Sequence, residues 1–291
     1  MCDAVSTNMR RAAGFVKFIR PANCLMMGFA VVVGASLVVA PSTLATGFFG
    51  LLLGYVTGFA LTGASMAIND YYDRDIDAIN APDHPIPSGA VKPKESVVFA
   101  AVLTVVGMVA AAFTSPACIL VAAVSWVVSV TYSTVGKRTG LPGNFLVSAC
   151  VAISFIYGSF VVGQSLKLNI VFFAALALIS NMGREVTKGI VDVEGDKTKK
   201  IRTVAVVHGE KTASYVAAAF FLSAVCLSLL PAPLGLVSAW FIPFVAIADL
   251  GFAASSFMLV RDPSRENARR IKKLVLLWMM MGLVAFIAGN M

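Results

Sequence analysis

Two short runs of acidic and amide side chains repeat at the spacing of a helical turn. They consist of Asn69, Asp70, Asp73 and Asp77, and of Asp192 and Asp196. Residues three or four positions apart share one face of a helix, and like charges placed there repel one another. Helix stability therefore does not account for either run, whereas a chemical role does.

Carboxylate and amide oxygens at this spacing are typical ligands of Mg²⁺. The ion prefers hard oxygen donors, and proteins usually bind it through a few carboxylates together with phosphate oxygens of a substrate. One charged run at a helix end is more often a solvated loop. Two runs at the same end of a helical bundle instead favour a diphosphate site, with metal ions between the carboxylates and the phosphate oxygens.

The elements that position both runs are predicted to be membrane helices. Hydrophobic residues make up 58% of the 291 residues and charged residues 13%, with a mean hydropathy of +0.85, whereas soluble domains carry about 25% charged residues. Four apolar stretches are each broken once by proline or polar residues, and a fifth is short; they are 21–69, 96–136, 139–183, 212–260 and 274–289. Since about 20 residues cross a bilayer, we expect an all-α polytopic protein with nine spans. Ala12–Ile19 is predicted to be a short helix at the membrane surface.

The basic residues predict the orientation of the spans. If the long charged loops lie on one side, 22 of the 23 Lys and Arg residues lie there, and only Lys167 lies on the other. Because cytoplasmic loops are enriched in Lys and Arg, we expect the N-terminus and both acidic runs in the cytoplasm, and the C-terminus outside the cell membrane. The net charge of +8 then reflects anionic lipid heads rather than nucleic-acid binding.

Basic residues at the ends of spans are candidate phosphate ligands. They are Arg20, Lys137, Arg138, Arg184 and Lys188. Phosphate is bound by cationic donors, and Arg offers two parallel N–H groups. Each position also suits a residue that sets topology or extends its charge to the interface. Lys188 points most clearly to function, because it lies four residues before Asp192.

Together these motifs resemble those of the UbiA superfamily of intramembrane prenyltransferases. The resemblance rests on Asn69-Asp70-x-x-Asp73-x-x-x-Asp77, Pro85-Ile86-Pro87-Ser88-Gly89 and Asp192-x-x-x-Asp196, and it extends from Arg20-Pro21-x-Asn23 to the last helix. It implies a single domain over 1–291, with a cytoplasmic cap over a helical bundle whose central cavity opens laterally to lipid. It also implies Mg²⁺-dependent transfer of a prenyl group from a prenyl diphosphate.

The resemblance assigns roles to individual residues. The implied metal ligands are Asn69, Asp73, Asp192 and Asp196, supported by Asp70 and Asp77. The implied phosphate ligands are Arg20, Lys137, Arg138 and Lys188, and the further substrate-binding residues are Asn23, Tyr132 and Arg184. Tyr132 would line the cavity near the reacting carbon.

The acceptor is indicated by the segment 183–196, which most resembles that of archaeal digeranylgeranylglyceryl phosphate synthases. The resemblance implies geranylgeranyl transfer to the hydroxyl of geranylgeranylglyceryl phosphate in ether-lipid biosynthesis. Gly189 and Val191 stand where that subgroup often has acids, and His84 where it usually has Arg, so an aromatic acceptor such as 4-hydroxybenzoate is the alternative. A transporter is a remote alternative. It would need polar residues across both leaflets of the membrane, whereas the acids here are clustered at one end of the spans and the loops at the other end are nearly uncharged.

Two isolated polar residues carry separate expectations. Asp249 lies within the eighth span, where a carboxylate exposed to lipid is costly, so we expect it to face the bundle interior or a polar cavity. His84 is expected to be a solvated loop residue, with phosphate binding as the alternative.

Overall fold

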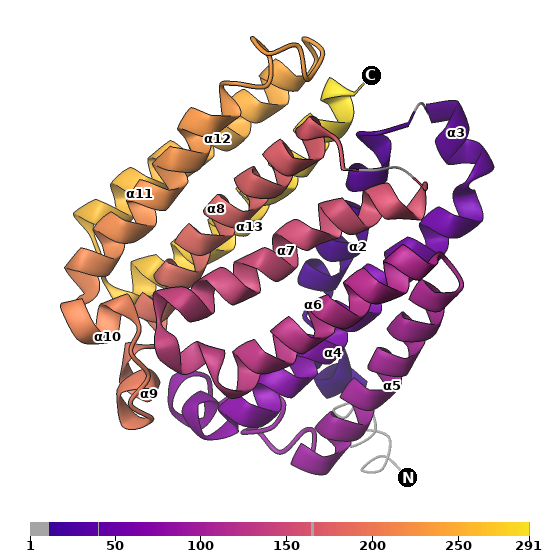
Figure 1. The fold of residues 1–291 in the computed structure, drawn as a ribbon. Helices are drawn as coiled ribbons and strands as arrows, with labels where there is room; N and C mark the ends of the chain where they lie inside the picture. The colour runs from indigo at the N-terminus through magenta and orange to yellow at the C-terminus, as the bar shows by residue number, and fades with distance from the viewer. Residues whose placement is uncertain (1–11, 40, 164–165, 291) are drawn as a thin grey trace.

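The computed structural model describes residues 12–39, 41–163 and 166–290, and within these ranges the chain contains helices and connecting segments but no strand. Arg10 and Arg11, which contribute to the predicted charge asymmetry, lie outside the described residues. The helices run along one common direction, as Figure 1 shows, and the segments that connect them lie at the two ends of the bundle.

The long helices match the predicted spans. They are α2 (Pro21–Ser36), α4 (Phe48–Asn80), α5 (Pro93–Ala112), α6 (Pro116–Thr134), α7 (Leu141–Val161), α8 (Leu168–Val191), α11 (Glu210–Ser228), α12 (Phe241–Arg261) and α13 (Arg265–Gly289). The shorter elements are α3 (Pro41–Thr46), the 3₁₀ helix η1 (Gly136–Thr139), α9 (Val193–Thr198) and α10 (Val204–His208). Proline occupies the first turn of α2, α5, α6 and α7, where its missing N–H costs no helical hydrogen bond.

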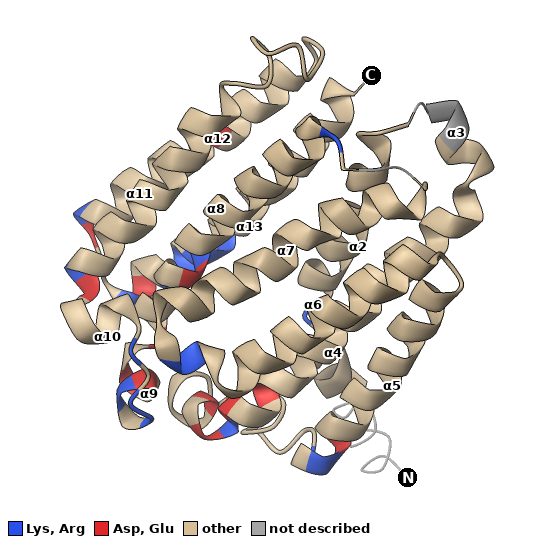
Figure 2. Ribbon diagram, in the orientation of Figure 1, with Lys and Arg blue, Asp and Glu red and all other residues tan. Residues whose placement is uncertain are grey.

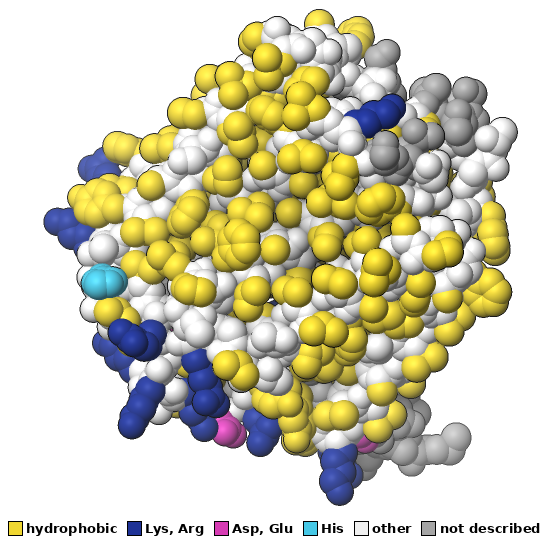
Figure 3. All heavy atoms as spheres, in the orientation of Figure 1, with side chains coloured by type: hydrophobic (Ala, Val, Ile, Leu, Met, Phe, Trp, Pro, Cys, Tyr) yellow, Lys and Arg dark blue, Asp and Glu magenta, His cyan; other side chains and the backbone are white. Residues whose placement is uncertain are grey.

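Eight described helices are long and apolar enough to cross a membrane, and the count is nine if the bent pair Ala12–Ile19 and α2 is one span. This agrees with the predicted nine spans, and Ala12–Ile19 is helical as predicted. The acidic run is also helical, because α4 continues through Asn80. The side chains on the face in Figure 3 are mostly hydrophobic above a basic lower rim. The protein is therefore a multi-pass membrane protein.

Charged residues gather at one end of the bundle, the end that carries α9 and α10 (Figure 2). At the opposite end, Lys167 Nζ donates to the carbonyl oxygen of Val38 at 2.8 Å, and Asn290 Nδ2 donates to the carbonyl oxygen of Ser36. The C-terminal ends of α2 and α13 therefore meet the start of α8 at the sparsely charged end. This arrangement agrees with the predicted position of Lys167 away from the other basic residues.

The last helix packs back against the first, which closes the bundle. α2 contacts α4 and α7, α8 contacts α7, α11 and α13, and α13 contacts both α12 and α2. Two glycines let α2 and α7 approach closely. A Cβ on Gly158 would overlap the carbonyl oxygen of Val31, and a Cβ on Gly34 would overlap the backbone of Phe155. This close packing fixes α2, and with it the residues just before it, against the rest of the bundle.

Candidate active site

The first acidic run forms a buried hydrogen-bonded group on α4. The side chains of Asn69, Asp70 and Asp73 are all buried. Asn69 Nδ2 donates to Asp73 Oδ2 at 2.7 Å, and Lys137 Nζ from η1 donates to the same oxygen at 2.5 Å. The 3₁₀ turn after α6 thus places the predicted phosphate ligand Lys137 directly on the predicted metal ligand Asp73.

Arg20 lies at the bend between Ala12–Ile19 and α2, where the two helix axes differ by 45°. Its backbone is left-handed, with φ of 47°, a conformation that costs a non-glycine residue energy and is often retained at functional sites. Its NH2 group donates to Asp70 Oδ1 at 2.5 Å. One turn into α2, Asn23 Nδ2 lies 3.8 Å from the sulfur of Met66 and borders the central cavity.

His84 belongs to the site rather than to a solvated loop, which corrects the sequence-based expectation. Its Nδ1 lies 3.2 Å from Asp77 Oδ2. Asp70, Asp77 and His84 each place one potential ligand atom within 4.8 Å of the others. Asp73, Asp192 and Asp196 do not reach that spacing within the described ranges, so as they stand these three carboxylates do not share one ion's coordination shell.

The second acidic run lies at the junction of α8 and α9. Asp192 is the last residue before α9 and is partly exposed, whereas Asp196 is only 1% exposed. Burial raises the pKa of Asp196 to about 7, and the charge of Lys137 opposes the shift. The charges of Asp73 and Asp192 also act on Asp196, which brings the two runs into one electrostatic group.

A brace that the sequence did not reveal joins the two runs. Asn80, at the end of α4, donates from Nδ2 to the carbonyl oxygen of Asp192 at 3.0 Å and accepts from the Gly195 N–H at 3.1 Å. Arg265 at the start of α13 donates from Nε to the Val191 carbonyl at 3.0 Å and from NH1 to Glu194 at 2.7 Å. Its NH2 group donates to the Asn80 carbonyl at 3.2 Å and to Asn80 Oδ1 at 3.5 Å. A side chain at position 195 would overlap the Asn80 amide.

The residues present fit a divalent cation. Asn69 Oδ1 and Asp196 Oδ1 are buried oxygen acceptors without a hydrogen-bond partner among the residues that the structure describes, and such groups are costly unless something binds them. One comes from each acidic run. The surrounding donors are carboxylate and amide oxygens, the ligand type that Mg²⁺ prefers.

A second polar group lies on α8, and sequence reasoning identified only part of it. Glu185 is 8% exposed and pairs with Arg184 at 3.3 Å and with Lys188 at 3.9 Å. Glu185 lies three residues before Lys188 and seven before Asp192, so the three residues share one face of the helix. This spacing is the sequence signal that could have identified Glu185 as part of the site. Arg138, in contrast, is exposed, so the structure does not bring this predicted phosphate ligand into the buried group.

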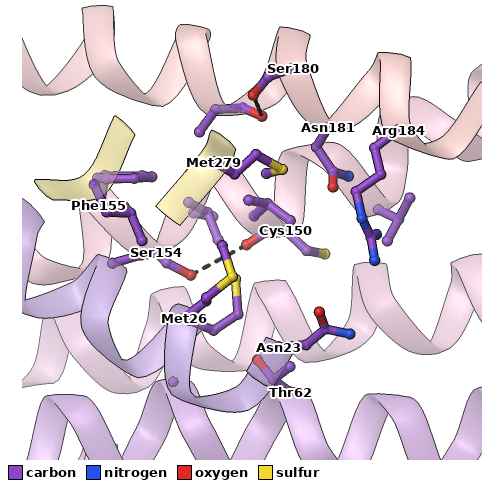
Figure 4. Close-up of a pocket in the computed structure, with 18 of the residues that line it drawn as sticks. Asn23, Met26, Thr62, Cys150, Ser154, Phe155, Ser180, Asn181, Arg184 and Met279 are labelled. Carbon is purple, nitrogen blue, oxygen red and sulfur yellow. Dashed lines mark hydrogen bonds between the residues drawn. The ribbon is translucent and has the colours of Figure 1, made fainter. Parts of the chain in front are cut away.

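A mostly apolar cavity extends into the bundle from these polar residues. It is lined from α2, α4, α6, α7, α8, α11, α12 and α13. Figure 4 shows Arg184 and Asn181 on one side of it and Asn23 and Thr62 on the opposite side. Tyr132, predicted to line the cavity, is 6% exposed and does so. Asp249 also lines it and accepts a hydrogen bond from Ser228 at 2.7 Å, as expected for an acid within a span.

The fold and the site together define a polytopic membrane protein with a metal-type carboxylate cluster above an apolar cavity. The sequence profile described as the UbiA prenyltransferase family matches residues 24–284. The chain therefore belongs to the UbiA prenyltransferase family.

Individual relatives agree along nearly the whole chain. Digeranylgeranylglyceryl phosphate synthase of Natronomonas pharaonis is 38% identical over 265 residues, which cover 89% of this chain and 92% of the relative. A solved structure of a digeranylgeranylglyceryl phosphate synthase is 26% identical, with a TM-score of 0.70 over 96% of this chain and 98% of that one. A UbiA homologue from Archaeoglobus fulgidus, solved with DMAPP and Mg²⁺, is 15% identical with a TM-score of 0.66, over 94% and 98% of the two chains, and it supports the fold alone.

Proposed function

We propose that this protein transfers a prenyl group, in a Mg²⁺-dependent reaction, from a prenyl diphosphate to the hydroxyl of geranylgeranylglyceryl phosphate. The observation that carries the proposal is the 38% identity, over nearly the full length, to a digeranylgeranylglyceryl phosphate synthase. The donor we expect is geranylgeranyl diphosphate, which would make the product a membrane ether-lipid precursor. The whole of 1–291 acts as one domain in this proposal.

The carboxylate cluster is the proposed site for the donor diphosphate and its metal ions. Asn69, Asp73, Asp192 and Asp196 are the proposed metal ligands, with Asp70 and Asp77 in support. The unpartnered oxygens of Asn69 and Asp196 support this assignment. Bound Mg²⁺ would neutralise charge on the departing diphosphate.

Residues of the chain supply the remaining requirements of the reaction. Lys137 and Arg20, each paired with a carboxylate of the cluster, are placed to hold diphosphate oxygens as the allylic C–O bond breaks. The cavity walls exclude water that would otherwise capture the allylic cation. Tyr132 borders the cavity, and its position supports a role in lining the site of the reacting carbon.

The sidedness of the membrane is part of the proposal. With nine spans, an N-terminus in the cytoplasm places the carboxylate cluster in the cytoplasmic half and the C-terminus outside. The concentration of Lys and Arg at the end that carries α9 and α10 supports this orientation (Figure 2). A cysteine-accessibility measurement at that end and at the turn that contains Lys167 would test it.

The function is tested with purified protein in detergent, Mg²⁺ and radiolabelled geranylgeranyl diphosphate, and with geranylgeranylglyceryl phosphate and 4-hydroxybenzoate offered separately. We expect label on the glyceryl phosphate and no transfer after chelation of divalent ions. Label on the aromatic ring instead would replace the proposed acceptor by the alternative one.

The metal-site assignment has its own test. Asp73→Ala and Asp192→Ala should each abolish transfer while the protein stays folded, whereas Asp83→Ala, which removes an exposed acid paired with Lys17 at 2.7 Å, should retain it. Full activity in either cluster variant would contradict the assignment.

A further inference from the structure

Three cations converge on one buried carboxylate beside the metal-type cluster. Arg184 and Lys188 both pair with Glu185. α13 packs against α8 and contributes Lys272, whose charge lies within electrostatic range of Lys188, Arg184 and Asp192. Lys272 likewise acts on Glu185. The four side chains, Arg184, Glu185, Lys188 and Lys272, are called the basic cluster below.

The basic cluster has more positive charge than its own acid neutralises. Its three cations have one carboxylate of their own, and Lys188 and Lys272 also interact electrostatically with Asp192 of the carboxylate cluster. In the described part of the chain Lys272 has no ion pair or hydrogen bond of its own. Uncompensated charge of this kind is costly at a partly buried position unless a ligand compensates it. The excess of two positive charges matches a phosphomonoester, which carries close to two negative charges at neutral pH.

The neighbouring carboxylate cluster has the opposite balance. Five acids, Asp70, Asp73, Asp77, Asp192 and Asp196, are accompanied there by the two permanent cations Arg20 and Lys137. That cluster suits a phosphate bound through divalent ions, whereas the basic cluster suits a phosphate bound directly. The site therefore offers two phosphate positions of different chemistry.

Arg184 provides the basic cluster with an N–H donor that is available to a ligand. Its Nε is buried and has no hydrogen-bond partner within the described ranges, although NH1 is paired with Glu185. Figure 4 shows its guanidinium extending into the cavity next to Asn181. An Arg with free N–H groups at a cavity wall is suited to two parallel hydrogen bonds with phosphate oxygens.

We propose that the basic cluster binds the phosphomonoester of the acceptor, with Arg184, Lys188 and Lys272 as its ligands and Glu185 holding the three cations together. The proposal rests on the proposed function and adds to it the position of the acceptor phosphate and a new residue, Lys272. Because Asp192 acts electrostatically on both Lys188 and Lys272, the acceptor phosphate lies beside the donor site rather than in it.

The test compares two acceptors in two proteins. Transfer to geranylgeranylglyceryl phosphate and to geranylgeranylglycerol, which lacks the phosphate, is measured for the unaltered protein and for Lys272→Met. Loss of one charged ligand should lower kcat/KM for the phosphate-bearing acceptor by about tenfold or more. Transfer to geranylgeranylglycerol and the KM for the donor should stay nearly unchanged. Lys273→Met, which removes an exposed lysine from the next position of α13, is the matched control.

Each other outcome is informative. Equal losses with both acceptors, or a raised KM for the donor, would place Lys272 on the donor diphosphate and overturn the proposal. The same holds if the unaltered protein does not distinguish the two acceptors. If Lys272→Met does not fold, Lys272→Gln provides the same comparison with a polar side chain of similar length. Absence of transfer to either glyceryl acceptor in the unaltered protein would instead contradict the proposed function itself.

Discussion

Asn80→Ala tests whether the brace between the two acidic runs sets the geometry of the site. The Asn80 side chain is 7% exposed and bonds two backbone groups, the carbonyl of Asp192 and the N–H of Gly195. Alanine removes both hydrogen bonds, together with the one that Asn80 Oδ1 accepts from Arg265 NH2 at 3.5 Å. Within the described part of the chain the Gly195 N–H is then left without a partner, whereas the Asp192 carbonyl keeps its bond from the Asp196 N–H at 2.9 Å. No charge and no proposed metal ligand is altered.

The size of the effect follows from the bond to Gly195. An unsatisfied buried polar group costs about 1–3 kcal/mol, and the Gly195 N–H is such a group in the braced geometry of the variant. Much of this cost is recovered if α9 moves away from α4, because water then reaches the freed N–H. Such movement displaces Asp196 relative to Asp73, and a misplacement of about 1 Å can lower a rate about 100-fold.

The measurement is transfer activity against Mg²⁺ concentration, together with the melting temperature in detergent. We expect a loss of kcat/KM of about 100-fold and a higher half-saturating Mg²⁺ concentration. Asn169→Ala is the matched control. Asn169 also bonds two backbone groups, the Leu37 carbonyl at 2.7 Å and the Ile170 N–H at 2.9 Å, at the other end of the bundle. If the Asn80 variant keeps the unaltered Mg²⁺ dependence, the brace does not position the ligands.

Two further predictions concern the packing that supports the site. Gly158→Ala should destabilise the protein by about 1–3 kcal/mol, because the added Cβ would overlap the Val31 carbonyl. Gly282→Ala is the control, since a Cβ at position 282 meets open space. Thermal melting in detergent compares the two variants, and equal melting temperatures would contradict the inferred packing. Arg265→Met should raise the half-saturating Mg²⁺ concentration, as Asn80→Ala should. It removes the hydrogen bonds from α13 to the carbonyls of Val191, next to the second acidic run, and of Asn80, at the end of α4. An unchanged Mg²⁺ concentration would limit Arg265 to a structural role.

Much of the architecture is readable from the sequence because the bilayer imposes it. Uncharged stretches of fixed length and their proline breaks predict the spans, and the structure has nine candidate spans when the bent pair counts as one. The spacing of Asn69, Asp73 and Asp77 predicts a shared face only if the helix continues, and α4 does continue to Asn80. Both signals are local, so no knowledge of the tertiary contacts is needed.

The residues that sequence reasoning missed depend on contacts between distant segments. Asn80 and Gly195 are 115 positions apart, and Arg265 is 185 positions from Asn80. The local sequence does not distinguish Lys272 from Lys273, because only the packing of α13 on α8 places Lys272 in the basic cluster. The contact of His84 with Asp77 depends on tertiary structure in the same way, because the loop after α4 folds back onto the helix; the sequence offered only phosphate binding as an alternative to a solvated loop residue.

The charge layout also gives a reason for metal dependence that does not rest on the ligand list. A diphosphate approaching the cavity meets a cluster with an excess of acids on α4 and α9 and a cluster with an excess of cations on α8 and α13. Without divalent ions, Coulomb repulsion at the first cluster and attraction at the second favour placing the donor where the acceptor phosphate belongs. Bound divalent ions would reverse that preference only at the carboxylates, since the basic cluster would repel them. The carboxylates that would hold the ions therefore also favour the donor diphosphate at the first of the two phosphate positions.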